Sequence, residues 1–136
     1  MRVATIFTRI IDGELPARFV YSDDQCVAFL SINPRRPGHT LVGPRAEVDH
    51  WIDLDAGQWR HLTAVARELG AALQRAFQPT KVGMMLAGLE VPHVHIHLVP
   101  IDSERDLSFA NADPNPSGEA LDDAAERIRN AVAALR

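Results

Sequence analysis

The sequence predicts an α+β domain: one antiparallel sheet of about five strands combined with three helices. Three observations predict this fold class. Apolar residues recur at helical spacing between residues 55 and 79, and they alternate with polar residues between 93 and 100. Short turns join the early strands, which favours antiparallel pairing. Because the chain has 136 residues and no internal repeat, we expect a single domain, 1–136.

Three segments predict helices. Residues 4–11 predict a short helix that stops at Asp12–Gly13, because glycine is favoured just after a helix end. A long helix follows Asp55, which pairs with Gln58 as a capping box, and it ends before Pro79. Residues 119–136 predict a third, amphipathic helix. The apolar stripes of the last two helices are Trp59, Leu62, Ala66, Leu69, Leu73 and Ala76, and then Leu121, Ala124, Ile128, Ala131 and Leu135.

Five segments predict strands. Residues 18–21 and 25–30 flank a Ser-Asp-Asp turn, and residues 39–43 follow a loop with two prolines and a glycine. Residues 81–87 and 93–100 follow the long helix. Trp51 and Trp59 are expected to be packing residues, and His50 and His61 are expected at the surface.

Composition and charge exclude several classes of protein. The net charge of −4 argues against nucleic acid as a partner, since phosphate-backbone affinity needs clustered Lys and Arg. The single cysteine, Cys26, cannot form an intrachain disulfide, and it is expected in a buried strand. Asp12 and Glu14 interrupt the N-terminal segment before a signal peptide or a membrane span could form. The expectation is a soluble, cytoplasmic protein without a membrane partner.

Three of the six histidines lie at alternate positions in the segment "VPHVHIHLVP". In a strand, His93, His95 and His97 would share one face, while the apolar residues between them would face the core. Four interpretations are open from these residues alone. The histidines are surface residues without a role, ligands of a divalent metal, a phosphorus nucleophile with its supporting residues, or a site that binds a phosphorylated ligand without turnover.

The segment "HVHIHLV" matches every position of the histidine-triad signature, in which histidines alternate with apolar residues. The segments "IIDGELPA", "VYSDD" and "PGHTLV" are also similar to this family. The chain therefore resembles the histidine triad (HIT) family, and within it the bacterial Hint-like branch, over nearly its whole length. The resemblance implies the HIT-like fold, with a short N-terminal helix, one long central helix and a C-terminal helix.

The resemblance also implies a function. Family members are hydrolases or transferases that act on a nucleoside 5′-phosphate bearing a leaving group, with a covalent nucleotidyl-histidine intermediate. The resemblance assigns the role of nucleophile to His95 and a contact with the phosphate or leaving group to His97. It implies that His93 and His39 order the triad. It implies no cofactor, a purine nucleotide substrate of the adenosine type, and a homodimer with one continuous sheet.

Several positions depart from the family pattern. Many bacterial relatives carry a structural zinc site, but here the corresponding positions are Thr5, Thr8 and Glu47, so we expect no metal. Ser31 stands at the ribose-contacting position, where Asp or Asn is usual. The expected nucleotide-binding residues before the triad are Gly88, Leu89 and Glu90, where Leu89 replaces the usual glutamine and the charge of Glu90 would repel phosphate.

Arg35, Arg36 and Arg45 flank the "PGHTLV" strand, and they are expected in solvated loops rather than as phosphate contacts. Two alternatives to the hydrolase remain. One is a nucleotide-binding or sensing module with little turnover, and the other is a three-His metalloenzyme.

Overall fold

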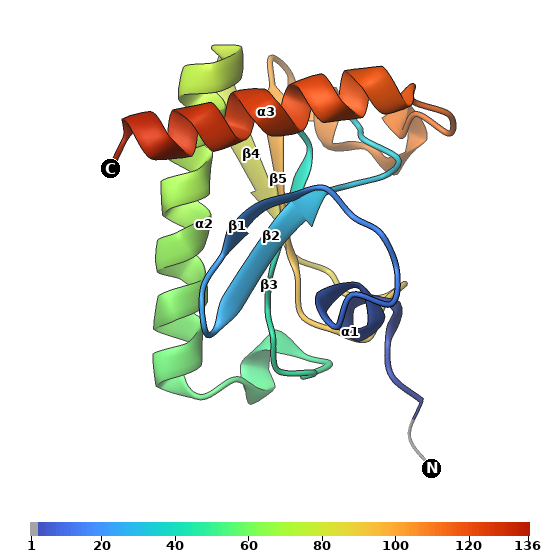
Figure 1. The fold of residues 1–136 in the computed structure, drawn as a ribbon, viewed down its shortest axis with the longest axis vertical. Helices are drawn as coiled ribbons and strands as arrows, with labels where there is room; N and C mark the ends of the chain where they lie inside the picture. Colours follow the sequence, from blue (N-terminus) through green and yellow to red (C-terminus); the bar gives the residue numbers. More distant parts are fainter. Residues whose placement is uncertain (1–2) are drawn as a thin grey trace.

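The predicted α+β architecture is present in the computed structural model, which describes residues 3–136 (Figure 1). The strands form one antiparallel sheet in the order β1-β2-β3-β5-β4. The helices and strands are α1 (Ile6–Ile11), β1 (Phe19–Ser22), β2 (Cys26–Leu30), β3 (Thr40–Pro44), α2 (Ala56–Phe77), β4 (Lys81–Met85), β5 (Ile96–Ile101) and α3 (Gly118–Ala134). Short 3-10 turns cover Trp51–Asp53, Glu104–Leu107 and Phe109–Asn111.

The signals at the helix ends act as predicted, with one exception. Asp55 and Gln58 form the capping box at the start of α2, and α2 ends at Gln78 in the left-handed conformation, with φ of 50°. The prediction that Leu135 lies on the apolar stripe of α3 is wrong. Leu135 is exposed because the helix ends at Ala134, and Val132 is buried on that face instead.

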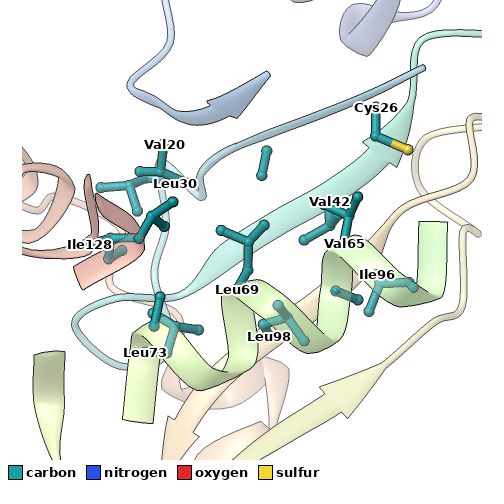
Figure 2. Packing of buried hydrophobic residues seen from close by; sticks show 14 of the residues in the cluster. Val20, Cys26, Leu30, Val42, Val65, Leu69, Leu73, Ile96, Leu98 and Ile128 are labelled. Atoms are coloured by element: carbon teal, nitrogen blue, oxygen red, sulfur yellow. The ribbon is translucent and has the colours of Figure 1, made fainter. Parts of the chain in front are cut away.

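The two faces of the sheet pack against different helices, because side chains alternate along each strand. One set of residues, including Ala28, Leu30 and Val42, packs with α2 and α3 in the main core. Figure 2 shows Val42, Ile96 and Leu98 against Val65 and Leu69 of α2. The set between them faces α1, and its members are Val27, Phe29 and Leu41, packed with Phe7 of α1.

Two glycines in and before β3 allow close packing near the histidines. Gly38 has φ of 93°, and a Cβ on it would lie 2.6 Å from the Phe77 ring. A Cβ on Gly43 would lie 2.8 Å from the carbonyl oxygen of Val94. Only glycine at position 43 therefore allows the backbone of β3 to lie this close to the segment just before β5.

The strand predicted for residues 93–100 begins later, at Ile96. The ladder with β3 pairs Val42 with Ile96 and Leu41 with His97, whereas the N–H of Val94 donates to the carbonyl of Val48 outside the sheet. His93 and His95 thus lie in the segment that enters the strand. The predicted alternation is still present, because Val94 and Ile96 are buried in the main core.

Among residues 3–136, none of the helices has the length and apolar character needed to cross a membrane.

Candidate functional site

The four histidines singled out in the sequence form a row along β3, from His39 at its start to His93 beside Pro44 at its end. His39, His93 and His95 are buried, and His97 is half-buried. The ring centroid of His97 lies 4.9 Å from that of His95 and 5.2 Å from that of His39. Because His39 immediately precedes β3 and His97 lies in β5, the pairing of these two strands holds the cluster together.

The hydrogen bonds fix which nitrogen of His95 carries its proton. Nδ1 of His95 lies 2.7 Å from the carbonyl oxygen of His93. A carbonyl oxygen can only accept, so Nδ1 donates and carries the proton. In the neutral ring, Nε2 of His95 therefore holds a lone pair, as a nucleophile requires.

The same reasoning assigns the proton positions of His39 and His97. The backbone N–H of Arg35 donates to Nδ1 of His39 over 3.1 Å, so the proton of neutral His39 is on Nε2. That Nε2–H donates to Nδ1 of His97 over 2.9 Å. Neutral His97 therefore carries its own proton on Nε2, and this N–H can donate to an oxyanion.

His93 is connected to α1 through a cluster of three further residues. Its Nε2–H donates to the carbonyl of Pro44 over 2.7 Å, so its Nδ1 accepts from the hydroxyl of Thr5, 3.2 Å away. The hydroxyl of Thr8 donates to Glu47 Oε1 over 2.8 Å, and the N–H of Thr5 donates to the same oxygen. We call Thr5, Thr8, Glu47 and His93 the Thr/Glu cluster.

Burial keeps all four histidines neutral at pH 7. Desolvation is the largest cause in each case, and it lowers the pKa of His39 to about 3 and that of His97 to about 4 from an ordinary 6.5. Neighbouring imidazoles and the charge of Arg35 lower these two values further. The pKa values of His93 and His95 are also lowered by burial, although hydrogen bonds to Pro44 and to His93 partly oppose the shift.

An aromatic hollow adjoins the buried end of the cluster. The ring centroid of Phe7 in α1 lies 4.7 Å from that of His95 and 5.4 Å from that of Phe29, and both pairs are edge to face. Sequence reasoning did not identify Phe7 as a site residue, because nothing local shows that α1 lies against the histidines. The residues that line the hollow are Phe7, Ile11, Val27, Phe29, Leu41, Gly43, Pro44, His93 and His95.

The four residues predicted to bind the nucleotide lie apart from this hollow. Ser31 accepts a hydrogen bond from the N–H of Asn33 and lines a cavity on the other side of His39. Gly88 has φ of 71°, and Leu89 beside it is 92% exposed. Glu90 is exposed, yet its charge raises the pKa values of both His95 and Arg35, so it lies on the open side of the cluster.

The three arginines have different environments, and the expectation for Arg35 is wrong. Arg35 is 4% exposed, and its guanidinium stacks on the Phe109 ring with Cζ 3.9 Å from the centroid. Arg36 forms ion pairs with Asp102 and Asp106. Arg45 is exposed and donates to Ser22 and to the carbonyl of Asp23. Arg35 is buried because Phe109, far along the chain, covers it.

The residues of the Thr/Glu cluster do not fit the zinc site of the bacterial relatives. Threonine hydroxyls stand where thiolates would bind zinc, and they are engaged in hydrogen bonds with His93 and Glu47. The triad does not form a three-His site either. Within the described part of the chain, the group of three possible ligand atoms that lie within 4.8 Å of one another is Asp23, Cys26 and His61.

In that group, the His61 ring nitrogen lies 2.7 Å from an Asp23 carboxylate oxygen, and the same carboxylate accepts from Tyr21 and from the N–H groups of Gln25 and Cys26. Burial raises the pKa of the Cys26 thiol to about 11, which disfavours the thiolate that a metal needs. This group is a turn stabilised by Asp23.

Comparisons with known proteins agree with this fold. A model of the HIT domain matches residues 12–104. An uncharacterized HIT-like protein of Methanocaldococcus jannaschii is 36% identical over 99 residues, which cover 70% of this chain and 77% of that protein. A Hit-like protein of Bartonella henselae involved in cell-cycle regulation has a similar structure, with a TM-score of 0.83 at 29% identity over 93% of this chain and 95% of that one.

A zinc-bound histidine triad family protein of Mycobacterium smegmatis gives a TM-score of 0.81 at 26% identity, over 96% of this chain and 94% of that one. The HIT-domain match includes all four clustered histidines, three in the triad segment and His39 just before β3. The chain belongs to the HIT family.

Proposed function

We propose that this protein is a nucleotide hydrolase or transferase of the histidine-triad type. Its substrate is a nucleoside 5′-phosphate that carries an amine or phosphate leaving group. The observation that carries the proposal is the hydrogen bond of 2.7 Å from Nδ1 of His95 to the His93 carbonyl, which leaves Nε2 free as a nucleophile. HIT family members are typically nucleotide hydrolases, which is consistent with this chemistry.

The reaction proceeds in two displacements at phosphorus. Nε2 of His95 forms a bond to the α-phosphorus while the bond to the leaving group breaks, and the leaving group departs with the electron pair and takes a proton from solvent. Water then adds to phosphorus, and the N–P bond breaks with its electron pair returning to Nε2. The proton that water loses returns to solvent, so protons balance over the cycle.

The neighbouring histidines stabilise the charges that develop. When His95 bonds to phosphorus its ring becomes cationic, and the carbonyl of His93 already accepts from its Nδ1–H. The Nε2–H of His97 donates to a phosphate oxygen, because Nδ1 of His97 is held by His39. Burial lowers the pKa values of these rings, so they react as neutral imidazoles at pH 7.

The aromatic side chains between α1 and the sheet are the proposed contacts of the base. The hollow there measures only about 10 Å³, so an adenine-type purine would pack on Phe7 and Phe29, beside His95, only once these side chains move apart. Such a pose places the 5′-phosphate at the histidines. Ser31, Gly88, Leu89 and Glu90 remain proposed contacts around the nucleotide, and the Hint-like branch remains the proposed place of this chain within the family.

Turnover of an adenosine 5′-phosphoramidate without added metal tests the proposal. We expect AMP release that falls at least about 10³-fold in His95→Ala, because the nucleophile is lost. His50→Ala is the matched control, since His50 is exposed and its ring contacts Trp51 rather than a histidine of the triad. Trapping of a nucleotidyl adduct on His95 in a His97→Ala variant, seen by intact-protein mass spectrometry, would identify the covalent intermediate.

The same assay separates the two alternatives. Tight nucleotide binding without turnover on a panel of phosphoramidates and dinucleoside polyphosphates would favour a sensing module. Turnover that a chelator abolishes and zinc restores would favour the metalloenzyme. Both ring nitrogens of His93 are already hydrogen-bonded, to Thr5 and to the carbonyl of Pro44, which supports the metal-free reaction.

We also propose a homodimer with a continuous sheet. The sheet order leaves β1 and β4 as edge strands, and Met84 on β4 is exposed. Sedimentation equilibrium of the wild-type protein and of Met84→Lys tests this arrangement. A dimeric wild type and a weaker dimer in the variant are expected if β4 forms the contact.

A further inference from the structure

Arg35 carries a buried positive charge that has no hydrogen-bond partner in the described chain. The residue is 4% exposed, and its Nη1 atom is buried without a partner. Within residues 3–136, its only hydrogen bond comes from its backbone N–H. Such a group is unfavourable without an anion, because burial removes the water that would otherwise solvate the charge. Arg36, the next residue, already pairs with Asp102 and Asp106.

The Phe109 ring holds the guanidinium in a fixed orientation. Cζ of Arg35 lies 3.9 Å from the ring centroid, so one face of the guanidinium is stacked. Stacking uses the face of the group and leaves its in-plane N–H donors for another partner. Burial lowers the pKa of Arg35, as expected for a cation that lacks an anionic neighbour in contact.

Arg35 and Phe7 lie at opposite ends of the triad. The Phe7 ring contacts His93 and His95, with centroids at 5.9 and 4.7 Å, whereas the Phe109 ring lies 6.4 Å from His97. A nucleotide with its base at Phe7 and its phosphorus at His95 would therefore extend its leaving group toward His97 and Arg35.

There is space beside Arg35, on the side of His39 that faces α3. A cavity of about 430 Å³ lies there, and its polar lining includes Ser31, Arg35, Arg36, Asn111, Asp113 and Asn115, whereas the three triad histidines do not line it. Nη1 itself is covered, so an oxyanion reaches it only when the cover shifts. Phe109 can shift more easily than a core residue, because it is 57% exposed and lies on a short 3-10 turn.

We propose that Arg35 is a specificity-determining residue that pairs with a carboxylate or phosphate group on the leaving-group side of the substrate. The inference rests on the proposed function, since it assigns the leaving group to the His97 end of the site. It predicts that the protein prefers anionic leaving groups over neutral ones. The planar fork of arginine matches both oxyanions with two parallel hydrogen bonds.

The first experiment compares two adenosine 5′-phosphoramidates that differ only at the far end of the amine. One ends in a carboxylate and the other in the uncharged carboxamide. We expect kcat/KM of the wild type to favour the carboxylate by about 10- to 100-fold, the range for a hydrogen bond to a charged group. Arg35→Gln should abolish this preference. Arg45→Gln removes the same charge from an exposed residue outside this cavity and should retain it.

The second experiment needs no turnover and uses a phosphate as the anion. Binding of ADP and AMP to the His95→Ala variant is measured by calorimetry, with and without Arg35→Gln. We expect ADP to bind about 10-fold more tightly than AMP when Arg35 is present, and equally well when it is absent.

The outcomes separate the two proposals. If the wild type turns over neither phosphoramidate but ADP binding depends on Arg35, the proposed function fails and the anion site stands. If both substrates are turned over without preference and ADP binds no better than AMP, the anion site is overturned. Equal losses on both substrates in Arg35→Gln, with a lower melting temperature, would also overturn it and would make Arg35 a structural residue.

Discussion

The two ends of the histidine cluster differ in how fully their polar groups are paired. At the His93 end, the Thr/Glu cluster and the carbonyl of Pro44 occupy both ring nitrogens of His93. At the His97 end, the guanidinium of Arg35 is buried beside Phe109 without a hydrogen bond to any residue that the structure describes. The ring nitrogens of His93 are thus paired within the protein, whereas the guanidinium of Arg35 leaves a place for an anion. Selectivity should therefore arise at the His97 end.

Acidification should have the largest effect on kcat/KM, because it can protonate histidines at both ends of the cluster. The pKa values of His39 and His97 are lowered to about 3 and about 4, so kcat/KM should stay level from pH 8 to well below pH 6. Below the lowered pKa of His95 it should fall about 10-fold per pH unit as the nucleophile is protonated. A fall with an apparent pKa near the ordinary histidine value would contradict the burial argument.

The same shifts link folding stability to pH. Between about pH 6.5 and pH 4, these histidines bind protons in the unfolded chain but not in the folded one. The free energy of unfolding should therefore be highest above pH 6.5 and decrease as the pH falls toward 4. Urea unfolding of the wild type and of His39→Gln at pH 7 and pH 5 checks this, and the variant should lose less stability.

Gly43→Ala should be the most damaging single substitution at the His93 end. Its Cβ would lie 2.8 Å from the Val94 carbonyl, which is backbone and cannot rotate away. We expect the free energy of unfolding to fall by about 1–3 kcal/mol, with a loss of kcat as His95 moves. Gly70→Ala on α2 is the matched control. Beyond its chain neighbours and the backbone of its own helix, no atom lies within 4 Å of its Cβ position, so the substitution should stabilise the helix by up to about 1 kcal/mol.

Thr8→Val should have a smaller effect on the same end. The substitution removes the hydroxyl that donates to Glu47, which should cost about 1 kcal/mol of stability and lower kcat several-fold with KM almost unchanged. Thr63→Val is the control, because Thr63 bonds only to helix carbonyls of α2. An unchanged kcat in Thr8→Val would show that the Thr/Glu cluster does not position His93.

Arg35→Met should have the smallest effect on stability. Replacing a buried, unpaired cation by an apolar side chain of similar length removes a desolvation cost, although it also removes the contact with Phe109. We expect a free energy of unfolding equal to that of the wild type or up to about 1 kcal/mol higher. A loss of several kcal/mol, measured by urea unfolding, would show that Arg35 holds the fold together.

The sequence was informative where local chemistry decides the structure. The capping box of Asp55 and Gln58 located α2, and the alternation around Ile96 identified the segment that presents the histidines. Arg35 was missed because an arginine in a proline-rich loop is normally solvated. Its burial depends on Phe109, which lies far along the chain. Contacts of that kind have no local signal.

The triad is a similar case at the level of the site. Spacing predicted that three histidines share one face, and the resemblance to the family brought in His39. The direction of each proton depends on partners that lie far apart in the chain, such as the carbonyl of Pro44 for His93 and the N–H of Arg35 for His39. These partners can be identified only once β3 and β5 are paired.

The Thr/Glu cluster has a consequence for the conditions under which the site keeps its shape. Peroxide does not oxidise threonine hydroxyls, and these hydroxyls bind no ion that could be released. Neither oxidants nor a lack of metal should therefore break the contact between α1 and His93. The single cysteine is buried in β2, with its pKa raised to about 11, and offers little thiolate to an oxidant. The junction between α1 and His93 therefore does not depend on the redox state or the metal supply of its surroundings.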